Sequence, residues 1–587
     1  MIKNDKIWIF ILAIILSFSL YGNTIGGNFV YDDQLYNDRQ ELRNLEHIDD
    51  VFTEPYVAHS PEAGVYRPIV TASFILNYSI FGDSPVSFRI VNIFLNGIVS
   101  FLVFLIIFKL TENKKLSYLT FLIFSFLPIH TEAVSFIKSR DEILSLLFVL
   151  LSLLFFLNKK MVWSSVLLFF AILSKEITII APAIFIYIFI SQDGFKLKEV
   201  IKKSLYYIPP FAGFVLLRFL ALGQYAFGNN ETQFIYNPLK FAEFNERIST
   251  ALKVTYLFVQ KLALPINLSA NYFYNTIKVI TNPFQSYQSI LGILILITLI
   301  YFILSKKFRR NIIGIAAIIY LLPYLVFSNL IFTSGDIMGE RWAYFPSIGF
   351  ALIMAYPIYK AFNSSKYKTI GYITIISLLA FYGVTTINRN KVWASNISLY
   401  QNMLETAPNS VLTRNNLAKL YLANGYIDEA KNEAQKAIAI HPFPPTLDFM
   451  GEIYIREERY NEAESLFKQS IELNPKPVRS YVNLGQMYYE IGKYKESVEI
   501  LEYPLSFLPT KRTVLLYSLS LIKLGQYQKA IDTIQEHSNN PSELQLKFAI
   551  GLAYFKMGEI EKANLYLEGV KSPELSEREF IKSLRDF

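Results

Sequence analysis

Two adjacent acidic residues, Asp32 and Asp33, follow the first apolar run of the chain. That run covers residues 7–21 and is apolar enough to enter a membrane, and a loop rich in glycine and aromatic residues leads from it to the acidic pair. A carboxylate at a membrane face can accept a proton from a hydroxyl group, and cationic side chains nearby can hold a phosphate. The pair therefore suits a reaction on a lipid-linked phosphate.

Further charged motifs lie beside later apolar runs, on the same expected side of the membrane. Charged residues next to membrane spans are costly and are often functional. We therefore take Asp32 and Asp33 as candidate catalytic residues. The candidate substrate- or lipid-phosphate-binding residues are Arg67, His130, Glu132, Arg140, Lys175, Glu176, Glu340 and Arg341.

Each candidate also has a structural interpretation. The acidic pair could be a solvated loop or a helix cap, and His130 beside Pro128 could be a hydrogen-bonded turn residue. Lys175-Glu176 and Glu340-Arg341 could each be a structural ion pair. The chain has only five histidines and no cysteine, so it does not favour a metal cluster. We expect no metal or other cofactor, although the residues do not exclude a divalent ion.

The composition indicates a membrane half and a soluble half. Hydrophobic residues make up 52% of the 587 residues, mean hydropathy is +0.31, and the apolar runs stop near residue 390. The absence of cysteine excludes disulfides and a cysteine nucleophile. Much of the net charge of +8 lies in short loops between apolar runs, which a membrane explains better than nucleic acid does.

Eleven apolar runs are candidate membrane spans. Lys3 and Lys6 precede the first run, but no small-residue cleavage site follows it, so we expect it to be retained. The basic loops after the second, fourth, sixth, eighth and tenth runs all fall on the side of the N-terminus, which predicts a cytoplasmic N-terminus and an outer C-terminal half. The predicted spans are 7–22, 89–110, 116–130, 142–157, 161–173, 177–191, 204–222, 286–305, 311–332, 344–362 and 368–387.

The segment 240–264 is only partly apolar and carries four charged residues. Counting it as a span would break the charge pattern, so we expect an interfacial helix on the outer side. The predicted domains are a membrane domain over 1–390, a linker over 391–407 and a repeat domain over 408–587.

The region after Trp393 repeats with a period of 33 or 34 residues. Pro408, Pro442, Pro475, Pro509 and Pro541 recur at this spacing, and Ala430, Ala463, Ser497, Ala530 and Ala563 recur within the same frame. Gly425, Gly492, Gly525 and Gly558 mark turns between helices. This pattern is typical of tetratricopeptide repeats, which stack into a superhelix with a concave groove.

The ordered motifs resemble those of a known family. Phe-x-Tyr-Asp-Asp, Tyr-Arg-Pro, His-Thr-Glu-Ala-Val, Ser-Lys-Glu and Glu-Arg-x-x-Tyr-x-Pro-Ser-x-Gly precede the repeats in this chain. This order resembles the transmembrane and tetratricopeptide-repeat-containing O-mannosyltransferases, which are similar to GT-C class glycosyltransferases. The lysine-, isoleucine- and asparagine-rich chain suggests a bacterial member.

The resemblance implies a role for some of the candidates. Asp32 matches the acid taken as the base for the acceptor hydroxyl, and Asp33 matches the acid that orients the acceptor. Arg140 and Arg341 match cationic positions that hold the lipid phosphate. It assigns no individual role to His130, Glu132, Lys175 and Glu176.

We therefore expect an all-α protein, a polytopic GT-C-like helix bundle followed by an α-solenoid, in a bacterial inner membrane with outer repeats. The expected function is inverting transfer of a mannose-like sugar from a polyprenyl-phosphate donor to Ser or Thr of a protein bound by the repeats. Two alternatives remain open at this point. They are transfer to a lipid or surface glycan, and a non-catalytic membrane-anchored scaffold.

Overall fold

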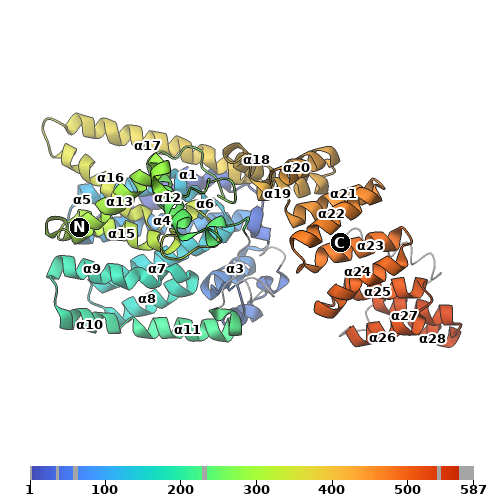
Figure 1. Cartoon of the computed structure of the whole chain (residues 1–587). Coiled ribbons are helices and arrows are strands. Elements are labelled where there is room, and N and C mark those ends of the chain that lie inside the picture. Colours follow the sequence, from blue (N-terminus) through green and yellow to red (C-terminus); the bar gives the residue numbers. More distant parts are fainter. Residues whose placement is uncertain (1–2, 35–38, 57–63, 228–233, 538–543, 568–587) are drawn as a thin grey trace. The chain divides into compact units, whose positions relative to one another are not determined.

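The computed structural model shows an all-helical chain in two compact units, Met1–Ser410 and Val411–Phe587 (Figure 1). It describes residues 3–34, 39–56, 64–227, 234–537 and 544–567. Within these ranges every regular element is an α-helix or a 3-10 helix, which confirms the predicted fold class. Pro541 and residues 568–587 of the predicted repeat domain lie outside the described residues.

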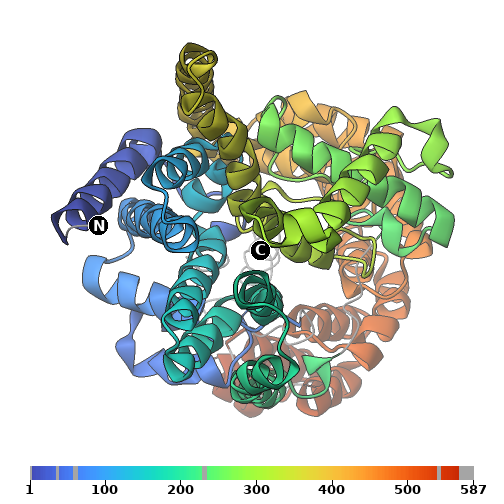
Figure 2. The same ribbon diagram turned by 90° about the vertical axis from the view of Figure 1, so that its left-hand side faces the viewer.

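Unit 1 is a bundle of roughly parallel helices, seen nearly end-on in Figure 2. Its α-helices are α1 Lys3–Tyr21, α3 Pro68–Phe81, α4 Pro85–Thr111, α5 Lys114–Phe126, α6 Thr131–Ser135, α7 Arg140–Leu157, α8 Met161–Ser174, α9 Ala181–Asp193, α10 Leu197–Leu205, α11 Ile208–Leu222, α12 Phe244–Ala263, α13 Tyr287–Leu304, α14 Lys306–Arg309, α15 Ile312–Phe327, α16 Ser347–Phe362, α17 Lys368–Asn390 and α18 Asn396–Thr406. Short 3-10 helices that matter for the site are η2 Tyr31–Asp33, η7 Pro128–His130, η8 Ile137–Ser139, η9 Glu176–Ile180, η13 Glu340–Ala343 and η14 Lys391–Ala394.

The apolar helices make the chain a multi-pass membrane protein. Each of the eleven predicted spans overlaps an α-helix of unit 1, although 116–130 and 311–332 extend past the ends of α5 and α15, and 204–222 is broken between α10 and α11. Six helical segments of the described residues are long and apolar enough to cross a membrane, and a bent pair formed by α5 and the segment Pro128–Ser135 makes a seventh. Four more apolar helices have only 10 to 17 residues, so the count of eleven stays a prediction.

The basic turns gather at one end of unit 1 and the acidic motifs at the other. Lys114, in the turn from α4 to α5, pairs with Asp5 of α1 at 2.8 Å, and Ser191 of α9 donates to the Arg309 carbonyl at 2.6 Å. Figure 1 shows the N-terminus and the turns after α9 and α16 at this end, with α3 and α6 at the opposite end. All the predicted site motifs connect helices at that opposite end.

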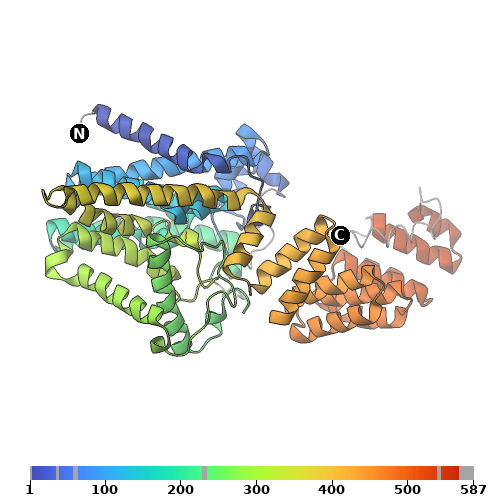
Figure 3. The same cartoon turned by 90° about the horizontal axis from the view of Figure 1, so that it is seen from above.

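The segment 240–264 forms α12, which lies across the long helices (Figure 3). It packs closely on α13, as shown by the space at Gly292, where a Cβ atom would lie 1.9 Å from the Leu252 carbonyl oxygen.

The segment predicted as a linker is also ordered, since η14 and α18 cover most of 391–407. Trp393 stacks on Phe136 with ring centroids 5.2 Å apart, and this burial of a large aromatic surface explains why the segment folds onto unit 1.

The described residues of unit 2 form five helical pairs with the predicted repeat geometry. The pairs are α19 Val411–Ala423 with α20 Ile427–Ile440, α21 Pro444–Arg456 with α22 Tyr460–Leu473, α23 Val478–Glu490 with α24 Tyr494–Phe507, α25 Lys511–Lys523 with α26 Tyr527–His537, and α27 Leu544–Met557 with α28 Ile560–Leu567. The recurring small residues of the second helices are all at most 1% exposed.

The turns within these pairs need a left-handed residue. Gly425, Gly492, Gly525 and Gly558 have φ between +75° and +82°. In the second pair Glu458 takes this place with φ of +59°, which explains why the glycine pattern skips that repeat.

Candidate active site

The loop that carries the acidic pair is held in a strained conformation. Tyr31 has φ of +53°, a value that costs a side-chain-bearing residue on the order of 1–3 kcal/mol. Its backbone N–H donates to the Asn396 side-chain oxygen at 2.6 Å, and its ring packs against Phe136 and Tyr400. These contacts fix the direction in which Asp32 leaves the loop.

The two acids have different environments. Asp32 forms an ion pair with the ammonium group of Lys138, and both side chains are about one-third exposed, 34% and 27%. Asp33 is fully buried and accepts hydrogen bonds from the backbone N–H groups of Lys138 and Val30, at 2.9 and 3.2 Å. Burial raises the pKa of Asp33 to about 7, although these two donors lower it. Of the two acids, only Asp32 is therefore accessible from outside the loop.

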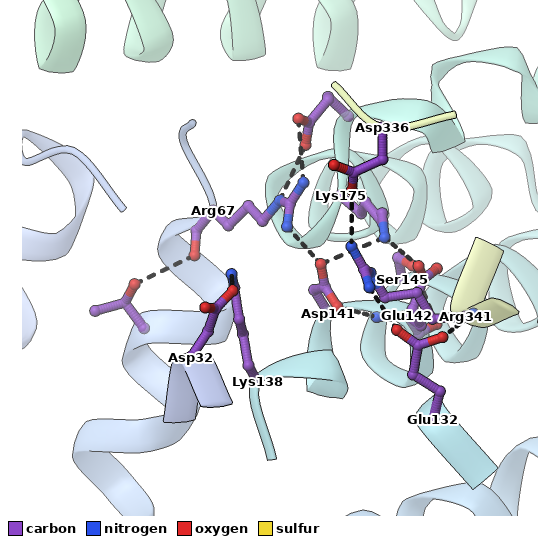
Figure 4. A network of polar contacts seen from close by, with 12 residues as sticks. Asp32, Arg67, Glu132, Lys138, Asp141, Glu142, Ser145, Lys175, Asp336 and Arg341 are labelled. Atoms are coloured by element: carbon purple, nitrogen blue, oxygen red, sulfur yellow. Dashed lines mark hydrogen bonds and ion pairs between the residues drawn. The ribbon is translucent and has the colours of Figure 1, made fainter. Parts of the chain in front are cut away.

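Close to Asp32, charged residues from several helical connections form neighbouring clusters of ion pairs, which we call the network (Figure 4). Arg67, just before α3, donates to Asp141 at 2.5 Å and to Glu176 at 3.2 and 3.3 Å. Lys175, at the end of α8, pairs with Asp141 at 3.4 Å and with Glu142. The ion pair suggested for Lys175-Glu176 does not form within that dipeptide. Each member instead binds a partner on another element.

Arg341 of η13 extends the network on its other side. Its backbone N–H donates to Glu132 at 2.8 Å, and its guanidinium pairs with the same carboxylate. Its Nη2 lies 3.7 Å from Asp336, which is too far for a hydrogen bond. The side chain is 21% exposed, so this cation retains a donor that faces accessible space.

Carboxylates outnumber the cations of the network. Four cations, Arg67, Lys138, Lys175 and Arg341, face six carboxylates, Asp32, Glu132, Asp141, Glu142, Glu176 and Asp336. Burial raises the pKa of Asp336, against the guanidinium of Arg341 that lowers it. At 3.7 Å, Asp336 is also the more distant of the two carboxylates that face Arg341.

Three sequence candidates lie outside this network. The His130 ring packs between Phe124 and Tyr344, and its Nε2 lies 2.8 Å from the Ser347 hydroxyl. Glu340 is buried and accepts from the Ser269 N–H at 2.7 Å and the Tyr272 hydroxyl at 2.5 Å. Both residues hold backbone segments together.

Arg140 is also separate from the network. It is fully buried and donates to the Asn92 and Asn77 side chains at 2.7 and 2.9 Å, and to the carbonyls of Ser73 and Phe88. Its guanidinium lies over the Phe74 and Phe88 rings. With its donors occupied, Arg140 ties α3, α4 and α7 together, and the structure gives it no opening for a lipid phosphate.

The sequence candidates omit four members of the network, Lys138, Asp141, Glu142 and Asp336. The first three stand in one charged run between η8 and α7, directly before a long apolar segment. That position is a usable signal, because carboxylates at the start of a membrane helix are costly unless they are paired. Asp336 has no such signal, since it lies in a loop between α15 and η13.

The repeats match a known family. The tetratricopeptide repeat models match residues 413–443, 445–477 and 466–499. This agrees with the repeat period and with the helical pairs of unit 2.

Most of the chain is similar to curated proteins with one kind of name. It is 24% identical over 83% of its length to the protein O-mannosyl-transferase TMTC3 of Homo sapiens, and 27% identical over 73% to a protein O-mannosyl-transferase of Caenorhabditis elegans. These matches confirm the resemblance indicated by the motifs. The chain covers 54% and 63% of those relatives, respectively, so it spans only part of their length.

Proposed function

We propose that this chain is an integral membrane glycosyltransferase. It moves a mannose-like sugar from a polyprenyl-phosphate donor to Ser or Thr hydroxyls of proteins, at the outer face of the membrane. The similarity to protein O-mannosyl-transferases supports the reaction class. The observation that carries the proposal is the partly exposed carboxylate of Asp32 beside a network that includes a guanidinium nitrogen without a hydrogen-bonded carboxylate, Nη2 of Arg341.

The transfer is a single displacement with inversion. Asp32 accepts the proton of the acceptor hydroxyl, whose oxygen forms a bond to the anomeric carbon of the sugar. The bond from that carbon to the phosphate oxygen breaks, and its electron pair leaves with the polyprenyl phosphate. Lys138, paired to Asp32 in the resting structure, moves to the phosphate as the negative charge develops there.

Arg341 holds the phosphate of the donor. Its Nη2 points toward Asp336 without a hydrogen bond, and a phosphate oxygen in that place gains a charge-assisted bond. Glu132 keeps the guanidinium in position through both the side chain and the backbone of Arg341. The step uses only residues of the chain and requires no metal.

The outer face is supported by the separation of charges along unit 1. The basic turns lie together at one end, and basic loops favour the cytoplasmic side. The acidic pair and the network lie at the opposite end, so we place the site outside, in a bacterial inner membrane. The repeats bind the acceptor polypeptide, a common use of stacked helical pairs with a concave surface.

The proposal is tested by transfer from purified polyprenyl-phosphate sugars to co-expressed outer-side proteins, with modified peptides identified by mass spectrometry. Asp32→Asn keeps the shape of the side chain but removes the proton acceptor, so transfer falls about 10²–10⁴-fold. Asp83→Asn is the matched control, because Asp83 is a 57% exposed carboxylate whose partner is Arg43, outside the network.

Three results would contradict the proposal. If Asp32→Asn transfers sugar at the wild-type rate, Asp32 is not the base. If a glycolipid is modified and no protein is, the acceptor is a lipid and not a protein. No transfer from any donor, with normal protein partners bound by the repeats, favours a non-catalytic scaffold.

A further inference from the structure

A polar cavity of about 380 Å³ lies in unit 1, and none of the charged residues of the network lines it. This volume falls within the range of roughly 300–1,000 Å³ that small-molecule sites occupy. The end of α17, the last turns of α18 and the loop after α12 form its wall. Its polar lining consists of Asn267, Thr385, Asn388, Arg389, Asn402, Glu405 and Thr406.

Arg389 supplies the cavity with a buried cation. Its side chain is 6% exposed, and its Nη1 donates to the Asn402 side-chain oxygen. Its Nη2 is buried without a hydrogen-bond partner among the described residues. The Glu340 carboxylate lies 3.9 Å from Nη2, too far for a hydrogen bond. A buried guanidinium donor without an acceptor carries an uncompensated desolvation cost, so an anionic group that reaches it gains charge-assisted hydrogen bonds.

A carboxylate of opposite charge, Glu405, also lines the cavity, with the Asn402 side chain between it and Arg389. Glu405 is exposed and receives only a weak hydrogen bond of 3.4 Å from the Asn402 amide. The cavity thus presents a buried cation and an exposed carboxylate, with neutral amides and hydroxyls between them. This pattern complements a small group that carries a phosphate at one end and an ammonium at the other.

The cavity begins where the membrane-facing surface of α17 ends. Exposed apolar side chains follow one side of this helix, namely Ile370, Ile373, Ile376, Phe381, Val384 and Ile387, each at least 40% exposed. The sequence then changes to Asn388-Arg389-Asn390-Lys391. Val384, Leu268 and Pro265 line the apolar side of the cavity. A change from exposed apolar to polar residues marks the interface between hydrocarbon and headgroups.

From these observations we propose that the cavity binds the headgroup of a phosphoethanolamine phospholipid. The phosphate contacts Arg389, the ammonium contacts Glu405, and the acyl chains lie along the apolar face of α17. The lipid is distinct from the sugar donor. Its site adjoins the site of transfer through one turn, because Glu340 faces Arg389 while the next residue, Arg341, faces Glu132.

The test measures retained lipid and does not depend on the proposed transferase activity. The full chain is placed in nanodiscs with equal amounts of phosphatidylethanolamine, phosphatidylglycerol and phosphatidylcholine, and native mass spectrometry identifies the lipids that remain bound. The wild type retains phosphatidylethanolamine preferentially. Arg389→Gln reduces this retention about tenfold, the effect of losing one charge-assisted contact.

Two further variants test the contribution of Glu405 and the specificity of the effect of Arg389. Glu405→Gln changes an exposed residue, so it folds, and it removes the preference for phosphatidylethanolamine over phosphatidylglycerol. Lys391→Gln is the matched control and retains lipid as the wild type does, because Lys391 is an exposed cation that does not line the cavity.

Other outcomes would overturn the assignment. Equal retention of the three lipids by the wild type, or retention unchanged in both Arg389→Gln and Glu405→Gln, excludes a headgroup site. Inorganic phosphate and soluble phosphoethanolamine can each be added as competitors. If phosphate displaces the bound lipid as well as phosphoethanolamine does, the site does not recognise the ammonium group, and the zwitterionic lipid is excluded as the ligand.

Discussion

Asp32 and Asp33 are neighbours in the chain, yet only one of them is exposed. The buried Asp33 accepts two backbone N–H groups and holds the loop against η8, while Asp32 extends toward the network. The expected role of Asp33 in orienting an acceptor is therefore indirect, through the position of the loop.

The buried carboxyl of Asp33 makes stability depend on pH. Its pKa is about 7 in the folded chain, above its ordinary value of 3.8, so the folded state binds more protons than the unfolded state between these values. Stability then falls as pH rises from about 4 to 7, by at most about 1.4 kcal/mol per pH unit.

This dependence is measured as the difference between the wild type and Asp33→Asn in thermal unfolding in detergent across that range. Asp33→Asn also loses one of two acceptors, which costs about 1–3 kcal/mol at low pH. If the difference between the two proteins is the same at pH 4 and pH 7, Asp33 does not titrate in this range.

Arg341 is the residue expected to bind the leaving phosphate. Arg341→Lys keeps a charge that can pair with Glu132 but loses the second nitrogen near Asp336. Turnover should fall about 10²-fold, as expected for the loss of one donor to the developing charge, while the melting temperature changes little. Arg43→Lys is the control, because the partner of Arg43, Asp83, lies outside the network. An equal loss of turnover in Arg341→Lys and Arg43→Lys would contradict a specific role of Arg341 in binding the phosphate.

At the scale of elements, a bend and a close contact position the network. Pro128 follows α5, and the helical segment after it turns by 51°, since proline ends the hydrogen-bond ladder of the preceding helix. The bend brings Glu132 to η13. His130 stabilises the bend by its contacts with Phe124, Tyr344 and Ser347.

The contact between α15 and α16 sets the position of η13 from the other side. A Cβ on Gly349 would lie 2.3 Å from the Ala316 carbonyl oxygen and 2.6 Å from the Tyr320 nitrogen. Gly349→Ala must therefore separate the helices and should destabilise the protein by about 1–3 kcal/mol, measured by thermal unfolding in detergent. Gly335→Ala is the control in the preceding loop, where a Cβ meets nothing within 4 Å, and equal stability of the two variants would contradict this packing.

At the scale of the whole molecule, the two units allow separate tests of the membrane chemistry and the repeats. Unit 1 contains the complete network, and unit 2 contains the five helical pairs. Deletion of residues 411–587 should abolish transfer to a protein acceptor but leave slow hydrolysis of the donor. Hydrolysis is measured as the release of free sugar, and transfer is measured by mass spectrometry of the acceptor protein.

The control for this deletion is the same truncated chain with Asp32→Asn, in which hydrolysis should also fall. Transfer to protein at the full rate by the truncated chain would show that the repeats serve another partner. A truncated chain that fails to insert is recognised by its absence from the membrane fraction.

The sequence by itself determined the helical architecture. Apolar runs of membrane length and the 33- or 34-residue repeat each depend on side-chain spacing along one helix or between adjacent helices. The eleven predicted spans and the five repeats therefore overlap helices. The sequence also located most of the charged motifs, because a charge beside an apolar run is visible in one dimension.

Only the tertiary structure decided which of those charges belong together. Arg140 and Asp141 are adjacent, yet the start of α7 directs Arg140 into the core of α3 and α4 and Asp141 toward Arg67 and Lys175. Glu340 and Arg341 separate in the same way at η13. Neighbours on a helical turn point in different directions, and their partners are more than 30 residues distant in the chain. The physical reason is that long-range pairing depends on how helices pack, which residue spacing within one element does not specify.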